Sequence, residues 1–500
     1  MSSEPPPRPR LALIISTLLG AAFLSALDSN IVATALPTIA GEMKGFSRLA
    51  WVTTAYIVTS TISSIILAKL SDLYGRRPIL LITIGLFVAG SLLCGAAQSV
   101  EQLIAFRAVQ GLGGGGILSI VFAVLGDLVP PIERSKYSGY FSIVFASGGV
   151  LGPLLGGLIV DHWSWRWIFL INLPLGLVVM LVISHALRIP KPHREVHIDY
   201  SGALVLSVML AAFMIGLEQS PTRGWRDGLV LGLFAVAVIG LAVFIRVEQK
   251  AREPIIPLHL FRSRLVICVS MLAMLLGAIL FALGLYFALF FQDVRFVSPT
   301  TSGLRLLPQV IAMTLVALVA GRTMARTGRY RWYPIGGSAL IVVGMVLSST
   351  VTVSTSYLRL GFALAIVGLG LGNFVLISSI AQNAAGPRDM GVISALQTFF
   401  RNLGGAVGLA IYSTVFTAVV KDGLVRRLPA GESPSLKIIR DPKSLRAASA
   451  PIRTAVQRSI TDGVSTVFRI AVGVAILALV ISVIMPEIPM RRTLEMPGTE

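Results

Sequence analysis

The chain has 500 residues, of which 55% are hydrophobic and only 13% are charged. A soluble protein of this length cannot bury so much apolar surface, so the composition excludes a soluble globular protein. The formal net charge of +19 would indicate a nucleic-acid partner in a soluble chain. Here the basic residues lie in short segments between apolar runs, as in the cytoplasmic loops of membrane proteins, and the sequence contains no nucleic-acid-binding motif.

Apolar runs of about 20 residues, the length that crosses a lipid bilayer, recur along the whole chain. We therefore predict an all-α polytopic membrane protein with about fourteen transmembrane helices. An even number places both termini on one side, and the loops on that side contain Arg76, Arg134, Lys250 and Arg326, which makes it the cytoplasmic side. The predicted spans are 11–36, 50–70, 78–97, 101–127, 138–160, 165–187, 200–218, 228–247, 265–291, 301–323, 332–352, 357–381, 391–419 and 464–486.

The segment 421–463 is an exception to this charge pattern, because it carries many basic residues on the predicted outer side. Loops of this length escape the bias more easily than short ones. The Ser, Pro and Arg content of the segment predicts a mobile or membrane-surface loop rather than a domain. We expect a monomer embedded in the lipid bilayer, and in a cell with two membranes this loop is where a periplasmic adaptor would bind.

A short internal repeat divides the chain. The segment 68–77 follows the second predicted helix and the segment 321–329 follows the tenth, with a small residue, a turn glycine and an arginine at matching offsets. Repeated halves are typical of secondary transporters, which bind substrate near the midplane between them. We predict an N-terminal six-helix half over 1–190, two linker transmembrane helices over 191–255, and a C-terminal six-helix half over 256–500.

One acidic residue, Asp28, lies inside the first apolar run. An ionised carboxylate in hydrocarbon costs at least ~2.5–3.5 kcal/mol, so this side chain should face the protein interior or a wet cavity. Low dielectric favours the neutral form of a carboxyl group, which makes Asp28 a candidate proton carrier. The alternative is an acid near a helix end that reaches the headgroups. Asp28 lies about nine residues, ~13 Å, before Pro37, which is deep for so short a side chain.

Arg107 lies about six residues, ~9 Å, into a helix that enters from the outer side. This depth is close to that of Asp28, and a buried arginine needs an anion. Since Asp28 is the only acid expected near that level, we predict that the two side chains pair and that Arg107 controls the protonation of Asp28. If Arg107 instead extends outward to the headgroups, this coupling is lost.

Several motifs in the same order resemble the major facilitator superfamily, specifically its fourteen-helix drug:proton antiporter group. The resemblance covers nearly the whole chain. The first-helix motif departs from the family pattern, since Asp28-Ser-Asn-Ile replaces the more usual Asp-x-Thr-Ile, but the acid is retained. The loop motif has Ala68 where the family typically has glycine. The motifs are 27–37, 68–77, 103–113, 148–157, 163–174, 298–308 and 400–405.

The resemblance implies roles for several of these motifs. Asp28 would couple transport to protons, and the loop after the second helix would form an inner gate between the halves. The start of the thirteenth helix, near Gly391, offers the positive end of a helix dipole to the Asp72 carboxylate. The inner-gate residues would be Asp72, Gly75, Arg76 and Arg77, with Arg401 as a further candidate. The motif that marks exporters, and packs helices closely, would be Gly148, Gly152, Pro153, Gly156 and Gly157.

The substrate site is predicted from isolated polar residues within apolar and aromatic helices. Such a lining suits hydrophobic and often cationic compounds better than sugars or phosphates. The run 113–116 lacks the Lys-Ser/Thr of a phosphate-binding loop and is expected to pack helices closely. The candidate cavity residues are Tyr56, Gln110, Asn172, Asn373 and Gln397.

We therefore expect a proton-driven exporter of hydrophobic or amphipathic small molecules that works by alternating access. The absence of Asn-x-Ser/Thr sequons fits a bacterial inner membrane. A proton-linked uptake symporter or a lipid transporter on the same fold is the alternative, and the direction of counterflow discriminates between them. A membrane sensor or scaffold would need a larger soluble domain than the tails and outer loop provide.

An enzyme is disfavoured, because the sequence shows no nucleotide-binding loop, metal cluster or nucleophile arrangement. Cys94 and Cys268 both lie in apolar runs and read as core residues rather than a disulfide or metal site. The five histidines lie at or near segment ends without the spacing of metal ligands. We expect no catalytic residues, metal or cofactor, and the proton gradient as the energy source.

Overall fold

The computed structural model describes residues 8–43, 49–187, 199–374, 376–384, 389–428, 445–446 and 449–490. These residues form helices joined by short connections, and they contain no strand. Fourteen helical segments of the described residues are long and apolar enough to cross a membrane. The predicted fold class and number of transmembrane helices are therefore confirmed.

The helices fall into three groups along the chain. The middle group is α8 (Tyr200–Arg223) and α9 (Gly228–Lys250). The first group is α1 (Arg8–Met43), α2 (Leu49–Tyr74), α3 (Arg76–Ala96), α4 (Val100–Leu128), α5 (Pro131–His162), α6 (Trp167–Leu170) and α7 (Asn172–Ala186). The last group is η2 (Leu258–Arg262), α10 (Arg264–Leu289), η3 (Phe290–Val294), α11 (Pro299–Arg305), α12 (Leu307–Thr327), α13 (Trp332–Ser349), α14 (Tyr357–Phe374), α15 (Ile377–Ala384), α16 (Met390–Arg427) and α19 (Ala450–Ile484).

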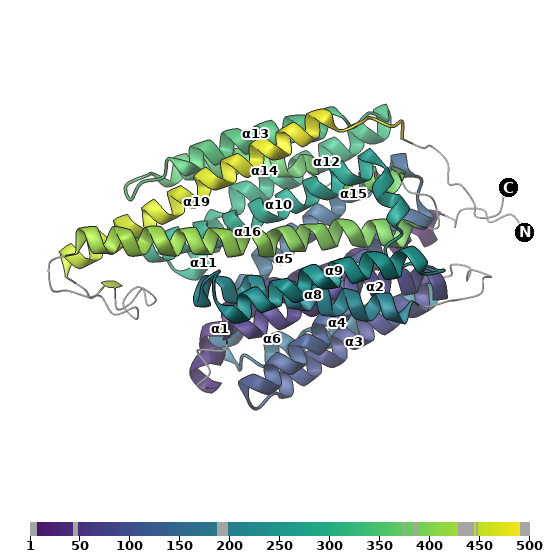
Figure 1. The fold of residues 1–500 in the computed structure, drawn as a ribbon, viewed down its shortest axis with the longest axis horizontal. Coiled ribbons are helices and arrows are strands. Elements are labelled where there is room, and N and C mark those ends of the chain that lie inside the picture. The colour runs from purple at the N-terminus through teal and green to yellow at the C-terminus, as the bar shows by residue number, and fades with distance from the viewer. Residues whose placement is uncertain are drawn as a thin grey trace, which may run out of the picture.

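The first and last groups form two helical bundles, and Figure 1 shows α8 and α9 between them. Within the first bundle α2 packs on α4 and α1 packs on α5, and within the last α10 packs on α16 in a matching way. Helix α8 contacts both α2 and α16. Helices α8 and α9 thus lie beside the contact between the bundles, while the division into two halves and two linker helices stays a prediction, and its boundary at 190/191 lies outside the described residues.

Buried and partly buried charges fix the end of α9 to the first bundle. Glu248 is buried, and its carboxylate accepts hydrogen bonds from the backbone N–H groups of Ile255 (3.2 Å) and Ile256 (3.4 Å). Beyond α9, Glu253 forms an ion pair with Lys69 of α2, with 3.3 Å between Nζ and Oε2. The Glu253–Lys69 pair ties the linker helices to the end of the bundle where α2 turns into α3, and Glu248 fixes the chain that follows α9.

Glycines allow α4 to pack very closely on its neighbours. A Cβ atom at Gly113 would overlap the backbone of Phe87 in α3, and one at Gly115 would overlap the carbonyl oxygen of Ser60 in α2. A Cβ at Gly114 would overlap the hydroxyl of Tyr56. The predicted packing role of the run 113–116 is therefore confirmed, and it draws α4, with Arg107, into the centre of the first bundle.

Replacing Gly115 with Val should destabilise the protein by about 1–3 kcal/mol or more, because the new side chain must displace the backbone of α2. Gly149 of α5 is the matched control, since no atom lies within 4 Å of its Cβ position. Thermal unfolding of both variants in detergent checks the expectation. Equal stability of Gly115→Val and Gly149→Val would contradict this account of the packing.

The prediction for 421–463 is wrong at both ends of the segment. Helix α16 continues to Arg427, beyond the predicted end at 419, and α19 begins at Ala450, well before 464. The two helices lie side by side here, because Arg427 pairs with Asp462 at 2.6 Å and donates a hydrogen bond to Ser459 at 3.3 Å. A paired helical extension thus replaces much of the expected loop (Figure 1). Because these two helix ends are rich in charged residues, the hydropathy pattern did not predict them.

Candidate functional site

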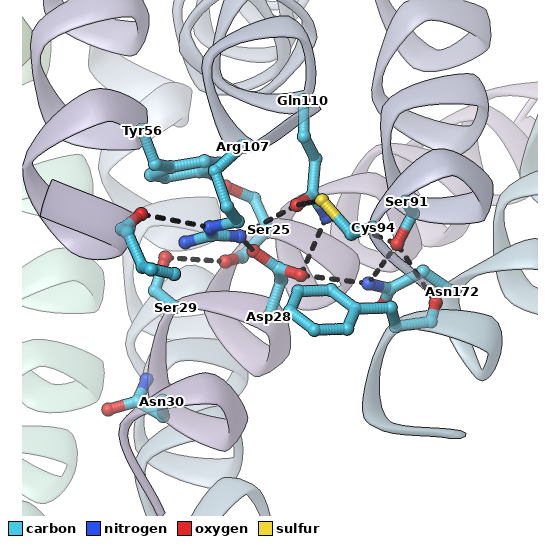
Figure 2. A network of polar contacts seen from close by, with 12 residues as sticks. Ser25, Asp28, Ser29, Asn30, Tyr56, Ser91, Cys94, Arg107, Gln110 and Asn172 are labelled. Carbon is cyan, nitrogen blue, oxygen red and sulfur yellow. Dashed lines mark hydrogen bonds and ion pairs between the residues drawn. The ribbon is translucent and has the colours of Figure 1, made fainter. Parts of the chain in front are cut away.

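The carboxylate of Asp28 is enclosed within the first bundle. It projects from α1, and the residue has an exposed fraction of 0%. Arg107 of α4, 2% exposed, places Nη1 at 2.9 Å from Asp28 Oδ2 (Figure 2). The two side chains thus form a buried ion pair between α1 and α4, as their matching depths predict.

Two amides complete the surroundings of Asp28. Gln110 Nε2 and Asn172 Nδ2 each donate a hydrogen bond to Asp28 Oδ1 at 2.8 Å. Ser91 lies behind them, since its hydroxyl oxygen accepts from Gln110 (3.1 Å) and Asn172 (2.9 Å) and donates to the carbonyl of Phe169 (2.9 Å). Four helices, α1, α3, α4 and α7, therefore meet at one carboxylate, which accepts from three donors (Figure 2).

The guanidinium of Arg107 is also well compensated. It donates to Gln110 Oε1 at 2.7 Å and to the carbonyl of Val52 at 3.4 Å. Its Cζ lies 4.1 Å from the ring centroid of Tyr56, a cation–π distance. A buried ion pair requires such additional partners, because its Coulomb attraction alone does not offset the cost of removing both charges from water.

The glycine face of α5 packs beside this site. A Cβ at Gly148 would lie 2.9 Å from the Cβ of Ala26, and one at Gly152 would lie 2.6 Å from the Cβ of Asn30. Ala26 and Asn30 flank Asp28 on α1, so α5 touches α1 on both sides of the acid. No atom lies within 4 Å of a Cβ at Gly157, so close packing is absent there. Gly156 is buried, and the side chain of Pro153 lies outside the described residues.

A second charged cluster lies at the turn between α2 and α3. Arg76 pairs with Asp72, and its Nε lies 2.7 Å from Asp127 Oδ2 at the end of α4. Gly75, at φ 97°, has the left-handed backbone that this tight turn requires. A Cβ at Gly391 would lie 2.5 Å from both carboxylate oxygens of Asp72, so the acid sits against the start of α16 as predicted. Sequence reasoning missed Asp127, which lies at the end of a span.

Three further contacts join the two bundles at this end of the molecule. Arg134 Nη1 donates to Gln382 Oε1 at 3.3 Å, and Ser135 Oγ donates to the carbonyl of Gly321 at 2.9 Å. The hydroxyls of Ser138 and Ser379 are 3.4 Å apart. Arg134, Ser135 and Ser138 lie in the first turns of α5, and their partners lie in α15 and toward the end of α12. We call the set, together with Asp72 and Gly391, the α2–α3 end closure. Sequence reasoning identified only its Asp72–Gly391 contact, because the others depend on tertiary packing.

The sequence profile of the Major Facilitator Superfamily matches residues 18–409. The chain belongs to the Major Facilitator Superfamily. "Multidrug resistance protein 3" of Bacillus subtilis (strain 168) is 35% identical over 496 residues, which is 97% of this chain and 96% of that protein. "Multidrug transporter protein MdtP" of the same strain is 35% identical over 408 residues, covering 81% of this chain and 75% of that protein.

Two solved structures have the same overall fold as this chain. The human organic anion transporter MFSD10 (TETRAN) matches with a TM-score of 0.63 at 15% identity, covering 94% of this chain and 100% of that chain. The proton:xylose symporter XylE matches with a TM-score of 0.63 at 12% identity, covering 97% of this chain and 98% of that chain. At these identities the likeness concerns the fold alone, which is that of the Major Facilitator Superfamily.

Two arginines that were predicted to form the inner gate lie apart from the Asp72–Gly391 contact. Arg77 donates a hydrogen bond to the carbonyl of Ser184 and so holds the end of α7. Arg401 lies about ten residues, ~15 Å, along α16 from Gly391. It therefore lies in the middle of a membrane span rather than in the α2–α3 end closure. Counting residues from the start of its helix predicts how deep Arg401 lies in the membrane, but not how far it lies from Asp72.

The five candidate cavity residues do not share one surface. Gln110 and Asn172 are fully buried and bind Asp28, while Tyr56 lies against Arg107. Asn373 donates to the carbonyl of Leu369 at 2.9 Å, and its Cβ lies against Gly337 of α13. Gln397 is buried against Ser270 of α10. Three of the five candidates therefore contact the Asp28–Arg107 pair, and the substrate cavity itself stays a prediction.

Proposed function

We propose that this protein exports hydrophobic or amphipathic small molecules across the cytoplasmic membrane in exchange for protons, by alternating access. The observation that carries this proposal is the enclosed Asp28 carboxylate, bonded to Arg107 inside a membrane span. The names of the two Bacillus subtilis relatives, a multidrug resistance protein and a multidrug transporter, support export of drug-like compounds. The proton gradient would be the only energy source.

The hydrogen bonds around Asp28 explain how one proton could act. The ionised carboxylate accepts from Arg107, Gln110 and Asn172 and donates to none of them. A proton on Oδ2 would remove the negative charge from the oxygen that accepts from the Arg107 guanidinium. Protonation removes the charge that holds Arg107 and so weakens the ion pair, and a proton on Oδ1 would also displace one of the two amide donors.

Helix α5 can carry this change to the other end of the molecule. Near Asp28 it contacts α1 through Gly148 and Gly152. At its start it contacts the last bundle through Arg134 and Ser135. A shift of α1 on protonation would thus move the same rigid helix that closes the α2–α3 end. We propose that this end faces the cytoplasm, with both termini, and that the described conformation is closed to the cytoplasm.

Transport in the opposite direction, or transport of lipid, would use the same chemistry. The test is reconstitution of the purified protein in proteoliposomes, an imposed pH gradient and a hydrophobic fluorescent dye. Export in exchange for protons predicts that dye and protons cross the membrane in opposite directions. Movement of dye and protons in the same direction would establish uptake by symport, and dye movement unaffected by the pH gradient would overturn proton coupling.

The closure itself can be tested at Gly391. Replacing Gly391 with Val should prevent the α2–α3 end from closing, because its Cβ would lie 2.5 Å from the oxygens of Asp72 and 2.7 Å from the guanidinium of Arg76. We expect transport to fall at least about tenfold, a barrier change of about 1.4 kcal/mol. Gly336→Val is the control, since no atom lies within 4 Å of that position.

A cysteine introduced at the buried Ser138 measures the closure directly. In the Gly391→Val background a membrane-impermeant maleimide added from the cytoplasmic side should label this cysteine faster than in the Gly336→Val background. Equal labelling rates and equal transport would contradict the proposed role of the Asp72–Gly391 contact.

A further inference from the structure

Arg401 is an intramembrane cation that the proton-coupling site does not use. It follows Asp389, the residue before α16, by about twelve residues, ~18 Å along the helix axis, so it lies near the middle of the span. Its carbonyl oxygen touches Gly277 of α10, where a Cβ would overlap it. Gly404 and Gly408, on the same face of α16, pack on Met274 and Ala278 of α10. This face points into the protein rather than toward lipid.

The guanidinium of Arg401 forms no hydrogen bond or ion pair with any described residue. Acids on its own bundle are distant along the helices, about 18 Å for Asp389, 24 Å for Asp293 and 31 Å for Asp422. Asp72, the acid of α2 nearest the start of α16, is paired with Arg76. A bare guanidinium at this depth costs at least about 2.5–3.5 kcal/mol. Arg401 is half-buried, and none of the residues that the structure describes supplies it with a counter-charge.

A second unsatisfied polar group lies one helical turn away. Gln397 is buried, and its Nε2 donates to Ser270 at 3.4 Å, but its Oε1 has no hydrogen-bond partner among the described residues. Side chains on a helix lean toward its N-terminus, so Arg401 extends over the turn that carries Gln397. Arg401 and Gln397 are four residues apart and so share a face of α16, which carries one positive charge and one acceptor without a partner among the described residues.

We propose that Arg401 binds the anionic group of a transported amphipathic compound, such as a carboxylate or sulfonate. A guanidinium forms paired hydrogen bonds with these groups, and the surrounding α10 and α16 surfaces are apolar, as the rest of such a molecule would be. The free Oε1 of Gln397 would accept from a hydroxyl or amide N–H on the same compound. This inference rests on the proposed export function and adds organic anions to a substrate class otherwise expected to favour cations.

The test is binding of three matched probes, a pyrene-bearing carboxylate, its methyl ester and the corresponding amine, to the purified full-length protein. Arg401→Gln should weaken carboxylate binding about 10- to 100-fold, the range of one lost charge-assisted contact, and change ester binding less than about twofold. Arg401→Lys retains the positive charge but not the paired N–H donors of the guanidinium. It should give an intermediate loss of affinity, for the carboxylate only. Arg469→Gln, an exposed intramembrane arginine that bonds Ser465, is the control.

Equal weakening of carboxylate and ester, or no weakening of either, would overturn the assignment. If Arg401→Gln does not fold, the Lys variant alone decides, because a purely structural arginine would not discriminate between the carboxylate and its ester. Dye transport by the wild-type protein separates this inference from the proposed function. Proton-driven transport of the amine or ester with no carboxylate selectivity would refute only the Arg401 site, whereas selective carboxylate binding without proton-driven transport would refute only the proposed export.

Discussion

Replacing Asp28 with Asn is expected to reduce dye efflux driven by a pH gradient at least tenfold, to the level of protein-free liposomes. Asparagine is similar in shape but carries no charge and does not take up a proton in this range. The variant therefore loses the exchange between a paired carboxylate and a neutral acid on which coupling depends. The measurement is efflux per folded protein in proteoliposomes, with Asp161→Asn, an exposed acid at the far end of α5, as the matched control.

Retention of full pH-driven efflux by Asp28→Asn would remove Asp28 from the coupling mechanism. Loss of efflux in both Asp28→Asn and Asp161→Asn would instead indicate a general effect of removing acids. The variant should still bind dye, because the carboxylate is enclosed and offers no exposed surface for dye to contact in this conformation. Binding without coupled transport is thus the specific expectation.

The second large effect concerns stability. Replacing Arg107 with Ala should destabilise the protein by about 3–5 kcal/mol, because it leaves the Asp28 carboxylate buried without its counter-charge. The double variant Asp28→Asn with Arg107→Met should recover most of this loss, since a neutral apolar pair of similar volume avoids the cost of burying charge. Unfolding in mild detergent measures both.

Stability and function should therefore separate in this series. The double variant is expected to be folded yet unable to couple transport to protons. An Arg107→Ala variant as stable as the wild-type protein would mean that the ion pair contributes no net stability. The proposed effect of protonating Asp28 would then lose its energetic basis. Additive effects of the two single changes would lead to the same conclusion.

The depth of charged residues in the apolar runs predicted the central pair of the site. Asp28 and Arg107 fall at similar levels when residues are counted from opposite helix ends, and only one acid was available for the arginine. Gln110 lies one turn after Arg107 on the same helix face, so its approach to Asp28 could also have been inferred. Asn172 could not, because the short connection between α6 and α7 sets its direction.

The closure between the bundles was less predictable. Gly391 was identified as the partner of Asp72 because a helix start attracts a carboxylate. The Arg134–Gln382 and Ser135–Gly321 contacts join residues far apart in sequence, and no local pattern encodes them. The helical extension of α16 and α19 was missed for a different reason. Its helices are charged and stabilise each other by pairing, so hydropathy gives no signal.

The most direct test of the central claim is a proton count during substrate binding. The purified protein is placed in weakly buffered solution with a pH indicator, and a hydrophobic dye substrate is added to the wild-type and Asp28→Asn forms. At a pH low enough to protonate Asp28, the proposed mechanism predicts release of about one proton per bound dye from the wild-type protein and none from Asp28→Asn, with dye binding retained. The same proton release from both forms would show that another group exchanges protons with substrate and would contradict the account.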